Sequence, residues 1–152
     1  MDSEGRSASF NRQAFHDYDI LERFEAGLVL TGTEIKSIRS GRADLRGSFA
    51  KSEQGELWLH GMHIAPYEHG GRYNQDPKRP RKLLLRRDQI KEIRAKLEQK
   101  GLAVVPIKLY VKRGWAKVEL GLARGKKKYD KRRDIIDRAL EREAQRAVRQ
   151  RV

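Results

Sequence analysis

The sequence predicts a mainly β protein, a small closed antiparallel barrel of about six short strands with two or three helices, followed by a basic tail. Three observations predict it. Short stretches of alternating apolar and polar residues recur along residues 10–124. Two helical patterns interrupt them. After residue 125, glycine and proline are absent and basic residues dominate. Among basic small barrels this pattern is typical of the OB-fold.

The first elements come from residues 1–30. Residues 1–9 are small and polar, so we expect a disordered segment there. Residues 18–24 and 28–30 have strand composition, and the intervening Ala26-Gly27 predicts a turn. Thr31 and Glu34 then have the spacing of a capping box. This predicts a short helix that ends before Gly41.

A hairpin and a loop follow. Residues 48–51 and 56–64 predict two strands joined at Gln54-Gly55, with Trp58, Met62 and Ile64 on one face and Leu57 and Leu59 on the other. Residues 66–82 hold three of the four prolines and a basic run at 78–82, so we expect a loop.

The clearest helix comes next. Ile90, Ile93 and Leu97 are spaced as on one helical face, Asp88 lies near the start and Gly101 follows the end.

Two alternating segments close the predicted barrel. Residues 105–111 and 116–122 predict strands joined by a turn at residues 112–114. Pro106 cannot donate a ladder hydrogen bond, so it must lie at an edge or a bulge.

The charge predicts the partner. The chain has 152 residues and carries 35 Lys and Arg against 21 Asp and Glu, a net charge of +14. Such an excess favours nucleic acid, because each cation that meets a phosphate releases condensed counterions. An acidic membrane is the competing partner, but it requires an amphipathic basic helix with bulky aromatic residues, which the sequence lacks.

Composition also restricts the chemistry and the compartment. The absence of cysteine excludes disulfides, zinc ribbons and thiol catalysis. No apolar run approaches the ~20 residues that span a bilayer, and residues 1–9 lack a signal-peptide core. We therefore expect a soluble cytoplasmic protein.

Catalytic patterns fail on spacing. Residues 121–127 resemble a phosphate-binding loop, but one residue too few separates the glycines and Lys127 replaces the Ser or Thr that holds magnesium. His60 and His63 would point to opposite faces of a strand, which disfavours a metal site. A small nuclease that uses Glu25, Glu34 and Asp44 remains an alternative. Otherwise we expect no enzyme activity, no metal and no cofactor.

Two basic segments are candidates for RNA binding. Residues 78–87 contain six Lys or Arg around an apolar triplet, either a phosphate-tracking edge or a solvated loop. Residues 126–152 hold 11 basic and 5 acidic residues with a thin apolar stripe. We expect this tail to be disordered alone and helical on RNA. The aromatic residues considered for base stacking are Phe15, Tyr18, Tyr73 and Tyr110.

Six blocks in order along the chain resemble the signature blocks of the SmpB family, the SsrA-binding proteins of trans-translation. They cover residues 11–12, 16–18, 24–28, 32–41, 81–85 and 125–132. The resemblance implies an OB-fold-like barrel that binds the tRNA-like domain of transfer-messenger RNA. It further implies that the complex enters stalled ribosomes with elongation factor Tu, which contacts the RNA.

The resemblance also implies roles for individual residues. The expected RNA-binding residues are Asn11, His16, Glu25, Lys36, Arg81, Lys82, Leu84 and Lys117. After binding, Gly125, Lys126 and Lys127 would act in accommodation. Tyr129, Asp130, Lys131 and Arg132 would lie in the decoding centre of the 30S subunit. The following helix, with Arg138, Arg142 and Arg146, would occupy the empty mRNA channel.

Some positions depart from the family pattern. Gln13 and Phe15 stand where many members have basic residues, and Leu140 stands where many have tryptophan. A generic single-strand RNA-binding or ribosomal OB-fold protein is the alternative within the binding class.

Overall fold

The computed structural model describes residues 6–126 and residue 142. In chain order the elements are β1 (Arg6–Phe10), α1 (Arg12–Asp17), β2 (Tyr18–Leu28), α2 (Gly32–Arg39), β3 (Ala43–Asp44), β4 (Phe49–Glu53), β5 (Glu56–His60), β6 (His63–Ile64), the 3-10 turn η1 (Gly71–Tyr73), β7 (Arg81–Leu84), α3 (Arg87–Leu97), β8 (Leu102–Lys112) and β9 (Trp115–Gly125).

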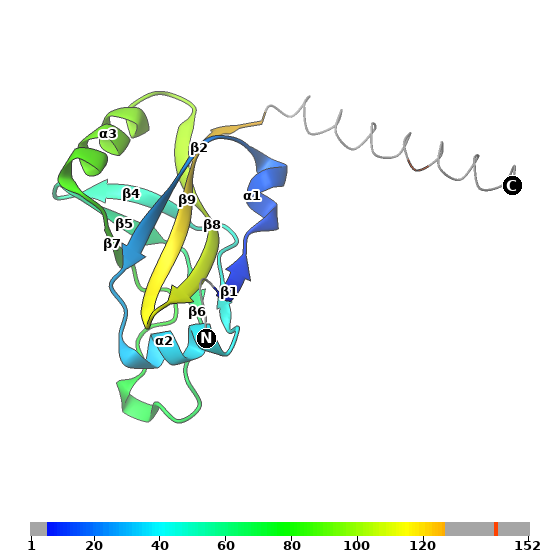
Figure 1. Cartoon of the computed structure of the whole chain (residues 1–152), viewed down its shortest axis with the longest axis vertical. Helices are drawn as coiled ribbons and strands as arrows, with labels where there is room; N and C mark the ends of the chain where they lie inside the picture. The colour runs from blue at the N-terminus through cyan, green and yellow to red at the C-terminus, as the bar shows by residue number, and fades with distance from the viewer. Residues whose placement is uncertain (1–5, 127–141, 143–152) are drawn as a thin grey trace, which may run out of the picture.

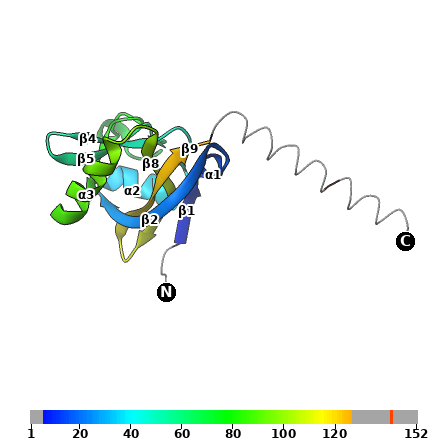
Figure 2. The same ribbon diagram turned by 90° about the horizontal axis from the view of Figure 1, so that it is seen from above.

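One curled antiparallel sheet dominates the fold (Figures 1 and 2). Its strand order is β1-β8-β9-β2-β7-β5-β4, and β3 pairs with β6 in a separate two-stranded sheet. The edge strands β1 and β4 come close to each other as the sheet curls. On one side β4 lies against β8, and on the other β3 lies against β1. Within residues 6–126 no ladder joins β1 to β4. The mainly antiparallel β prediction is therefore confirmed, but the sheet is not closed as a barrel.

The long β8–β9 hairpin confirms the last two predicted strands. Arg113 and Gly114 have φ of 52° and 81°, the left-handed conformation that a two-residue hairpin turn requires. The register shifts between Pro106 and Lys108, so Pro106 lies at a bulge as expected. The backbone carbonyl of Ile107 accepts from the backbone N–H of Asn11 at 2.8 Å. The bulge thus anchors the chain just after β1.

Both longer predicted helices are present. Thr31 and Glu34 form the predicted capping box of α2, since Thr31 Oγ1 accepts from the Glu34 N–H at 3.3 Å and Glu34 Oε1 from the Thr31 N–H at 3.0 Å. In α3, Ile90 and Ile93 are buried against the sheet. None of the helices within the described residues is long and apolar enough to cross a membrane.

Two N-terminal predictions are wrong, and one helix was missed. Residues 6–9 are not disordered: they belong to β1, which pairs with β8, while residues 1–5 lie outside the described residues. Residues 12–17 form α1, a helix that the sequence did not predict. The Ala26-Gly27 turn does not exist, because β2 continues through both residues and pairs with β9 and β7. Pairing on both sides overrides the local turn preference of glycine.

The middle of the chain needs two further corrections. The predicted loop at residues 66–82 ends in β7, whose first residues carry the basic run into the sheet. The second hairpin strand stops at His60, and Gly61, with φ of 83°, redirects the chain into β6. Because of this bend, Met62 and Ile64 are buried together with Leu57 and Leu59 instead of on an opposite face.

Candidate nucleic-acid interface

Four residues form a row across the outer face of the sheet. Tyr110 on β8 lies opposite Lys117 on β9, Lys117 lies opposite Gly27 on β2, and Gly27 lies opposite Leu84 on β7. Directly opposed residues of antiparallel strands share one face. The fold therefore brings together Leu84, from the matching block 81–85, and Lys117, which lies 33 positions later and outside the six matching blocks. We call these four residues the outer row.

Glu25 lies beside the outer row and is held by it. Its partners across the sheet are Glu119 and, beyond that, Lys108. The hydroxyl of Tyr110 donates to the Glu25 carboxylate. Arg23 reaches Glu119 at 3.4 Å, and the Lys108 ammonium lies 5.2 Å from the Tyr110 ring centroid. Arg23 thus offsets the charge of Glu119, the Tyr110 hydroxyl orients an oxygen of Glu25, and Glu25 remains exposed.

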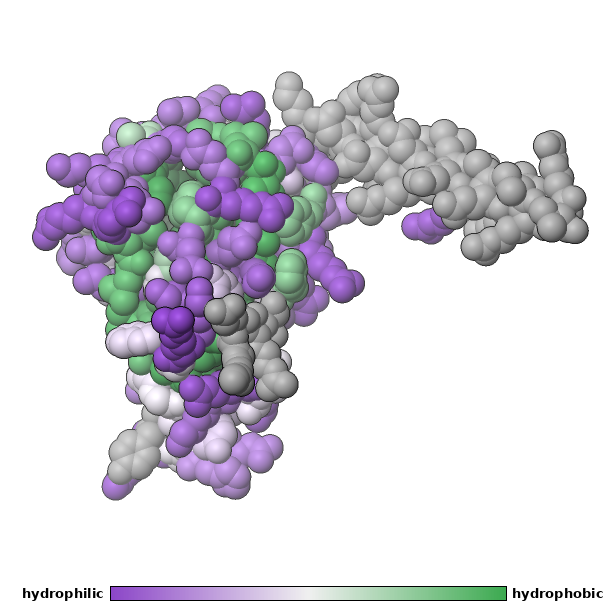
Figure 3. Space-filling model, viewed as in Figure 1, coloured by the Kyte–Doolittle hydropathy of each residue, from purple (hydrophilic) through white to green (hydrophobic). Residues whose placement is uncertain are grey.

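Gly27 explains how Leu84 reaches the outer row. A Cβ atom at position 27 would lie 3.3 Å from the Leu84 Cβ, closer than ordinary side-chain contacts. The glycine therefore leaves room for Leu84 to lie over the backbone of β2. Leu84 is 45% exposed there. The side of the molecule in Figure 3 shows hydrophilic side chains around patches of exposed hydrophobic surface.

The other expected RNA-binding lysines lie outside the outer row. Lys82 is two residues before Leu84 on the same face of β7, opposite Trp58, and its ammonium is 4.0 Å from Glu56. Lys36 is exposed on α2, 5.4 Å above the ring of Tyr67. Both remain available to an anion, but neither contributes to the cluster around Glu25.

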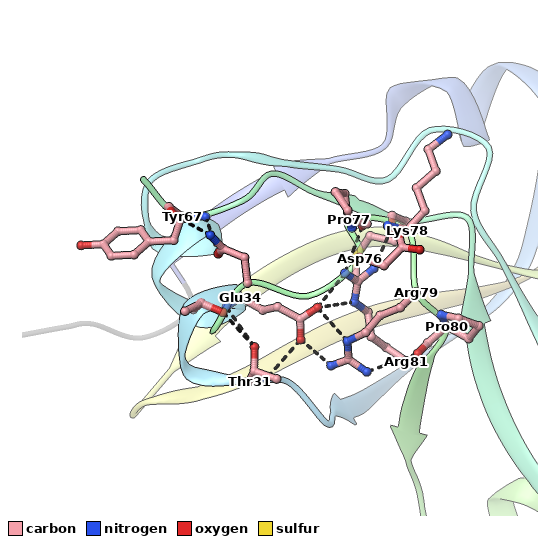
Figure 4. A network of polar contacts seen from close by, with 12 residues as sticks. Thr31, Glu34, Tyr67, Asp76, Pro77, Lys78, Arg79, Pro80 and Arg81 are labelled. Atoms are coloured by element: carbon pink, nitrogen blue, oxygen red, sulfur yellow. Dashed lines mark hydrogen bonds and ion pairs between the residues drawn. The ribbon is translucent and has the colours of Figure 1, made fainter. Parts of the chain in front are cut away.

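The structure contradicts the expectation that Arg81 binds RNA. Its side chain is fully buried, with 0% exposed, because residue 81 points inward on β7. Its guanidinium donates to Glu34 Oε2 at 3.0 and 2.7 Å, to the Met62 carbonyl at 2.7 Å and to the Pro77 carbonyl at 3.1 Å (Figure 4). A guanidinium that is fully buried and hydrogen-bonded at all three nitrogens cannot contact a phosphate, so Arg81 is structural.

Arg81, Arg79 and Glu34 form a buried ion network (Figure 4). Glu34 is only 4% exposed and accepts from both arginines, with Arg79 Nε at 3.1 Å. Burial raises the pKa of Glu34. Hydrogen bonds from Arg79, from the Thr31 backbone N–H and from Arg81 outweigh it, so the pKa lies below its ordinary value. Burial also lowers the pKa of Arg81 despite Glu34.

Asn11 is also buried, at 3% exposed. Its Nδ2 donates to the carbonyls of Pro106 at 2.8 Å and Leu45 at 3.4 Å. Its Oδ1 has no hydrogen-bond partner among the described residues. The side chain therefore ties β1 and α1 to the β8 bulge, and only Oδ1 retains an unused acceptor.

His16, Gly125 and Lys126 meet at the far end of β2. His16 Nδ1 lies 3.0 Å from Asp17 Oδ1, Gly125 pairs with Tyr18, and the Lys126 N–H donates to the Asp17 carbonyl at 2.9 Å. This end of β2 is nine residues from Gly27, a separation of about 30 Å for extended chain. The expected RNA-binding residues thus form no single cluster: the outer row lies at one end of β2 and His16 at the other.

Most of the expected tail residues cannot be placed. Lys127, Tyr129, Asp130, Lys131, Arg132, Arg138, Arg146 and the departure at Leu140 lie outside the described residues. Arg142 is described and exposed. The prediction that the tail is disordered alone and helical on RNA therefore stays a prediction.

The nuclease alternative finds no joint site. Asp44 binds Arg46 at 2.9 Å, and hydrogen bonds from Arg46 lower its pKa. Glu34 is occupied by arginines and Glu25 by Tyr110. Across residues 6–126 and 142, no three His, Asp or Glu side chains are grouped to hold a metal ion.

The aromatic candidates differ in access. Only 8% of Tyr110 is exposed, so its ring cannot stack on a base, and only its hydroxyl contributes to the surface. Phe15 is 37% exposed beneath Arg23, and Tyr18 is half-buried. The side chain of Tyr73 lies outside the described part. The sequence reasoning missed Trp115, which is 67% exposed beside the outer row. Its position two residues before Lys117 on an alternating strand could have revealed it.

Comparisons with known proteins place the chain in a family. The family model described as SmpB protein matches residues 8–150. An SsrA-binding protein of Geobacillus kaustophilus is 58% identical over 148 residues, covering 97% of this chain and 96% of the relative. An SsrA-binding protein of Carboxydothermus hydrogenoformans is 57% identical over 141 residues, covering 93% and 95%.

A solved structure agrees with these relatives. A chain described as "tmRNA-SmpB: a journey to the center of the bacterial ribosome" superposes with a TM-score of 0.68 at 56% sequence identity. The match covers 79% of this chain and 85% of that chain. Because sequence, family model and fold agree over most of the length, the chain belongs to the SmpB family of SsrA-binding proteins.

Proposed function

We propose that this protein binds the tRNA-like domain of transfer-messenger RNA and delivers it to stalled ribosomes for trans-translation. The observation that carries the proposal is the outer row with Glu25 beside it. It gathers a cation at Lys117, an exposed apolar side chain at Leu84 and an oriented carboxylate at Glu25 on one face. The names of its relatives and the solved tmRNA-SmpB structure support this partner.

The chemistry of the outer row suits a folded RNA. Lys117 neutralises a phosphate, and Leu84 packs against an unstacked base or a sugar. Glu25 is repelled by phosphates but accepts hydrogen bonds from base amino groups or 2′-hydroxyls. An interface that requires all three kinds of contact at fixed spacing recognises a defined RNA surface, whereas cations alone recognise any RNA.

The tail supplies the ribosomal part of the proposal. Residues 126–152 carry 11 basic and 5 acidic side chains. Such a cationic segment fits a channel walled by phosphates, and it enters only where mRNA is absent. We assign Gly125 and Lys126 to the start of this segment, Tyr129, Asp130, Lys131 and Arg132 to the decoding centre, and the following residues to the empty mRNA channel.

RNA preference tests the proposal. At matched salt, the protein is expected to bind the isolated tRNA-like domain at least tenfold more tightly than an unstructured RNA of equal length. Filter binding or fluorescence anisotropy against both RNAs measures the ratio. Equal affinities would instead identify a generic single-strand RNA-binding protein, and failure to bind the tRNA-like domain even at low salt would refute the proposal.

Lys117 gives a quantitative check of phosphate contact. In Lys117→Ala the slope of log K against log salt is expected to flatten by about 0.7–0.9, because one fewer counterion is released on binding. The matched control is Lys91→Ala, an exposed lysine on α3 with the same change in charge. Its slope should equal that of the wild type. An unchanged slope in Lys117→Ala would remove Lys117 from the interface.

A further inference from the structure

The tip of the β8–β9 hairpin carries the most exposed large hydrophobic side chain among the residues whose exposure is described, Trp115 at 67%. This hairpin tip lies at the same end of the sheet as the connection between β2 and α2 (Figure 1). Trp115 pairs with Lys112 across the two-residue turn of Arg113 and Gly114. Within residues 6–126, no aromatic ring or cation contacts the face of its indole.

The strand alternation fixes the direction of the indole. Ala116 is buried, so Trp115 and Lys117 on either side of it point to the outer face of the sheet. Two residues along a strand are about 7 Å apart. Trp115 is therefore the next outward residue after Lys117, and it extends the face of the outer row toward the hairpin tip.

The charge around Trp115 selects the kind of partner. Residues 99–118 contain no Asp or Glu, and three of their five basic residues are close to Trp115 along the hairpin. Lys112 lies opposite Trp115, and Arg113 and Lys117 are two positions to either side of it. The carboxylates that follow on this face, Glu119 and Glu25, lie beyond Lys117 and already have partners in Arg23 and Tyr110. Two features therefore coincide at the hairpin tip, an exposed flat aromatic ring and three cations. That combination is complementary to nucleic acid, whose phosphates pair with the cations and whose bases stack on aromatic rings.

We propose that Trp115 stacks on an unstacked nucleobase of the RNA bound at the outer row, while Lys112, Arg113 and Lys117 contact the flanking phosphates. The inference rests on the proposed function and deepens it. It supplies the exposed stacking surface that the buried ring of Tyr110 does not. Stacking does not release counterions, so Trp115 adds affinity without adding to the salt dependence of binding.

Affinity gives the first test. Trp115→Ala is expected to bind the tRNA-like domain about tenfold more weakly with an unchanged slope of log K against log salt. Trp115→Phe should retain most of the affinity, because it keeps an aromatic face. Phe49→Ala is the matched control, an aromatic residue that is 44% exposed on β4, away from the outer row. It should bind as the wild type does.

Intrinsic fluorescence gives a direct readout, because the chain has only two tryptophans, Trp58 and Trp115. In Trp58→Phe the remaining emission reports Trp115, and saturating RNA is expected to quench it strongly. In Trp115→Phe the quenching should be largely lost. Unchanged Trp115 emission at saturation, or a flatter salt slope in Trp115→Ala, would overturn the stacking role.

The outcomes separate this inference from the proposed function. If the wild type does not bind the tRNA-like domain, the proposed function fails. If Lys117→Ala is weakened but Trp115→Ala binds normally, only the stacking inference fails. Two other outcomes would assign the tip to another partner, provided that RNA does not quench Trp115. Without RNA, a shift of Trp115 emission with protein concentration would indicate self-association, and a shift on addition of anionic phospholipid vesicles would indicate a membrane.

Discussion

Glu34→Gln is expected to lower the free energy of unfolding by about 3–5 kcal/mol. The carboxylate is buried and is the only acidic side chain recorded in contact with the fully buried guanidinium of Arg81 among the described residues. Glutamine keeps the shape but removes the charge, so Arg81 remains buried without its counter-ion. Urea unfolding followed by circular dichroism measures the loss.

An exposed ion pair provides the control. Arg42 and Glu68 lie 3.9 Å apart with 45% and 76% of their side chains exposed. Glu68→Gln should change stability by less than about 1 kcal/mol, since solvent already screens that pair. If Glu34→Gln unfolded at the same urea concentration as Glu68→Gln, the buried network would add no more to the free energy of unfolding than an exposed ion pair does.

The same network gives stability a pH dependence. The pKa of Glu34 is lowered by folding from an ordinary value of 4.5. A carboxyl with a lowered folded pKa contributes stability above its unfolded pKa, and the contribution is lost as the pH falls through the folded pKa. Wild-type stability should therefore fall below about pH 4.5 more steeply than that of Glu34→Gln, which has no proton to gain at this position.

The network also links stability to the RNA face. Arg81 joins α2, through Glu34, to the carbonyls of Met62 and Pro77 at 2.7 and 3.1 Å. It is the first residue of β7, and Leu84 is the last. Loosening the start of β7 is therefore expected to disturb the position of Leu84 in the outer row. A destabilised Glu34 variant should lose RNA affinity even though Glu34 itself lies inside the protein.

Local sequence patterns correctly predicted those elements whose structure is determined by interactions within a few residues. The capping box at Thr31 and Glu34, the Arg113-Gly114 turn and the bulge at Pro106 all follow from backbone chemistry within a few residues. Gly27 marks the limit of that reasoning. A glycine after Ala26 predicts a turn, whereas pairing with β9 and β7 on both sides keeps β2 extended.

The resemblance named the residues of the candidate site, Glu25, Leu84 and Lys117, but gave no geometry for them. Only the sheet register brings them together. Arg81 was misassigned because a basic run normally lies on the surface. Its partner Glu34 is 47 residues away, and no local signal identifies that pairing. The same alternation that turns Arg81 inward turns Lys82 and Leu84 outward.

Truncation after Lys126 is expected to abolish tagging of stalled translation products while leaving RNA binding intact. The cut keeps the Lys126 N–H that donates to the Asp17 carbonyl at 2.9 Å, so the end of the β2–β9 pair stays closed. It removes ten basic and five acidic side chains. Those charges are the part of the chain assigned to the decoding centre and the empty mRNA channel, and the outer row is untouched.

Two measurements on the truncated protein separate the roles. Tagging is assayed in reconstituted translation on an mRNA without a stop codon, and binding of the tRNA-like domain is assayed with its salt dependence. Removal of Arg151 and Val152 alone is the control and should support tagging. Tagging by the long truncation would contradict the ribosomal role of the tail. Loss of RNA affinity with a flatter salt slope would instead mean that the tail contacts the phosphates of the bound RNA, because only lost phosphate contacts reduce counterion release.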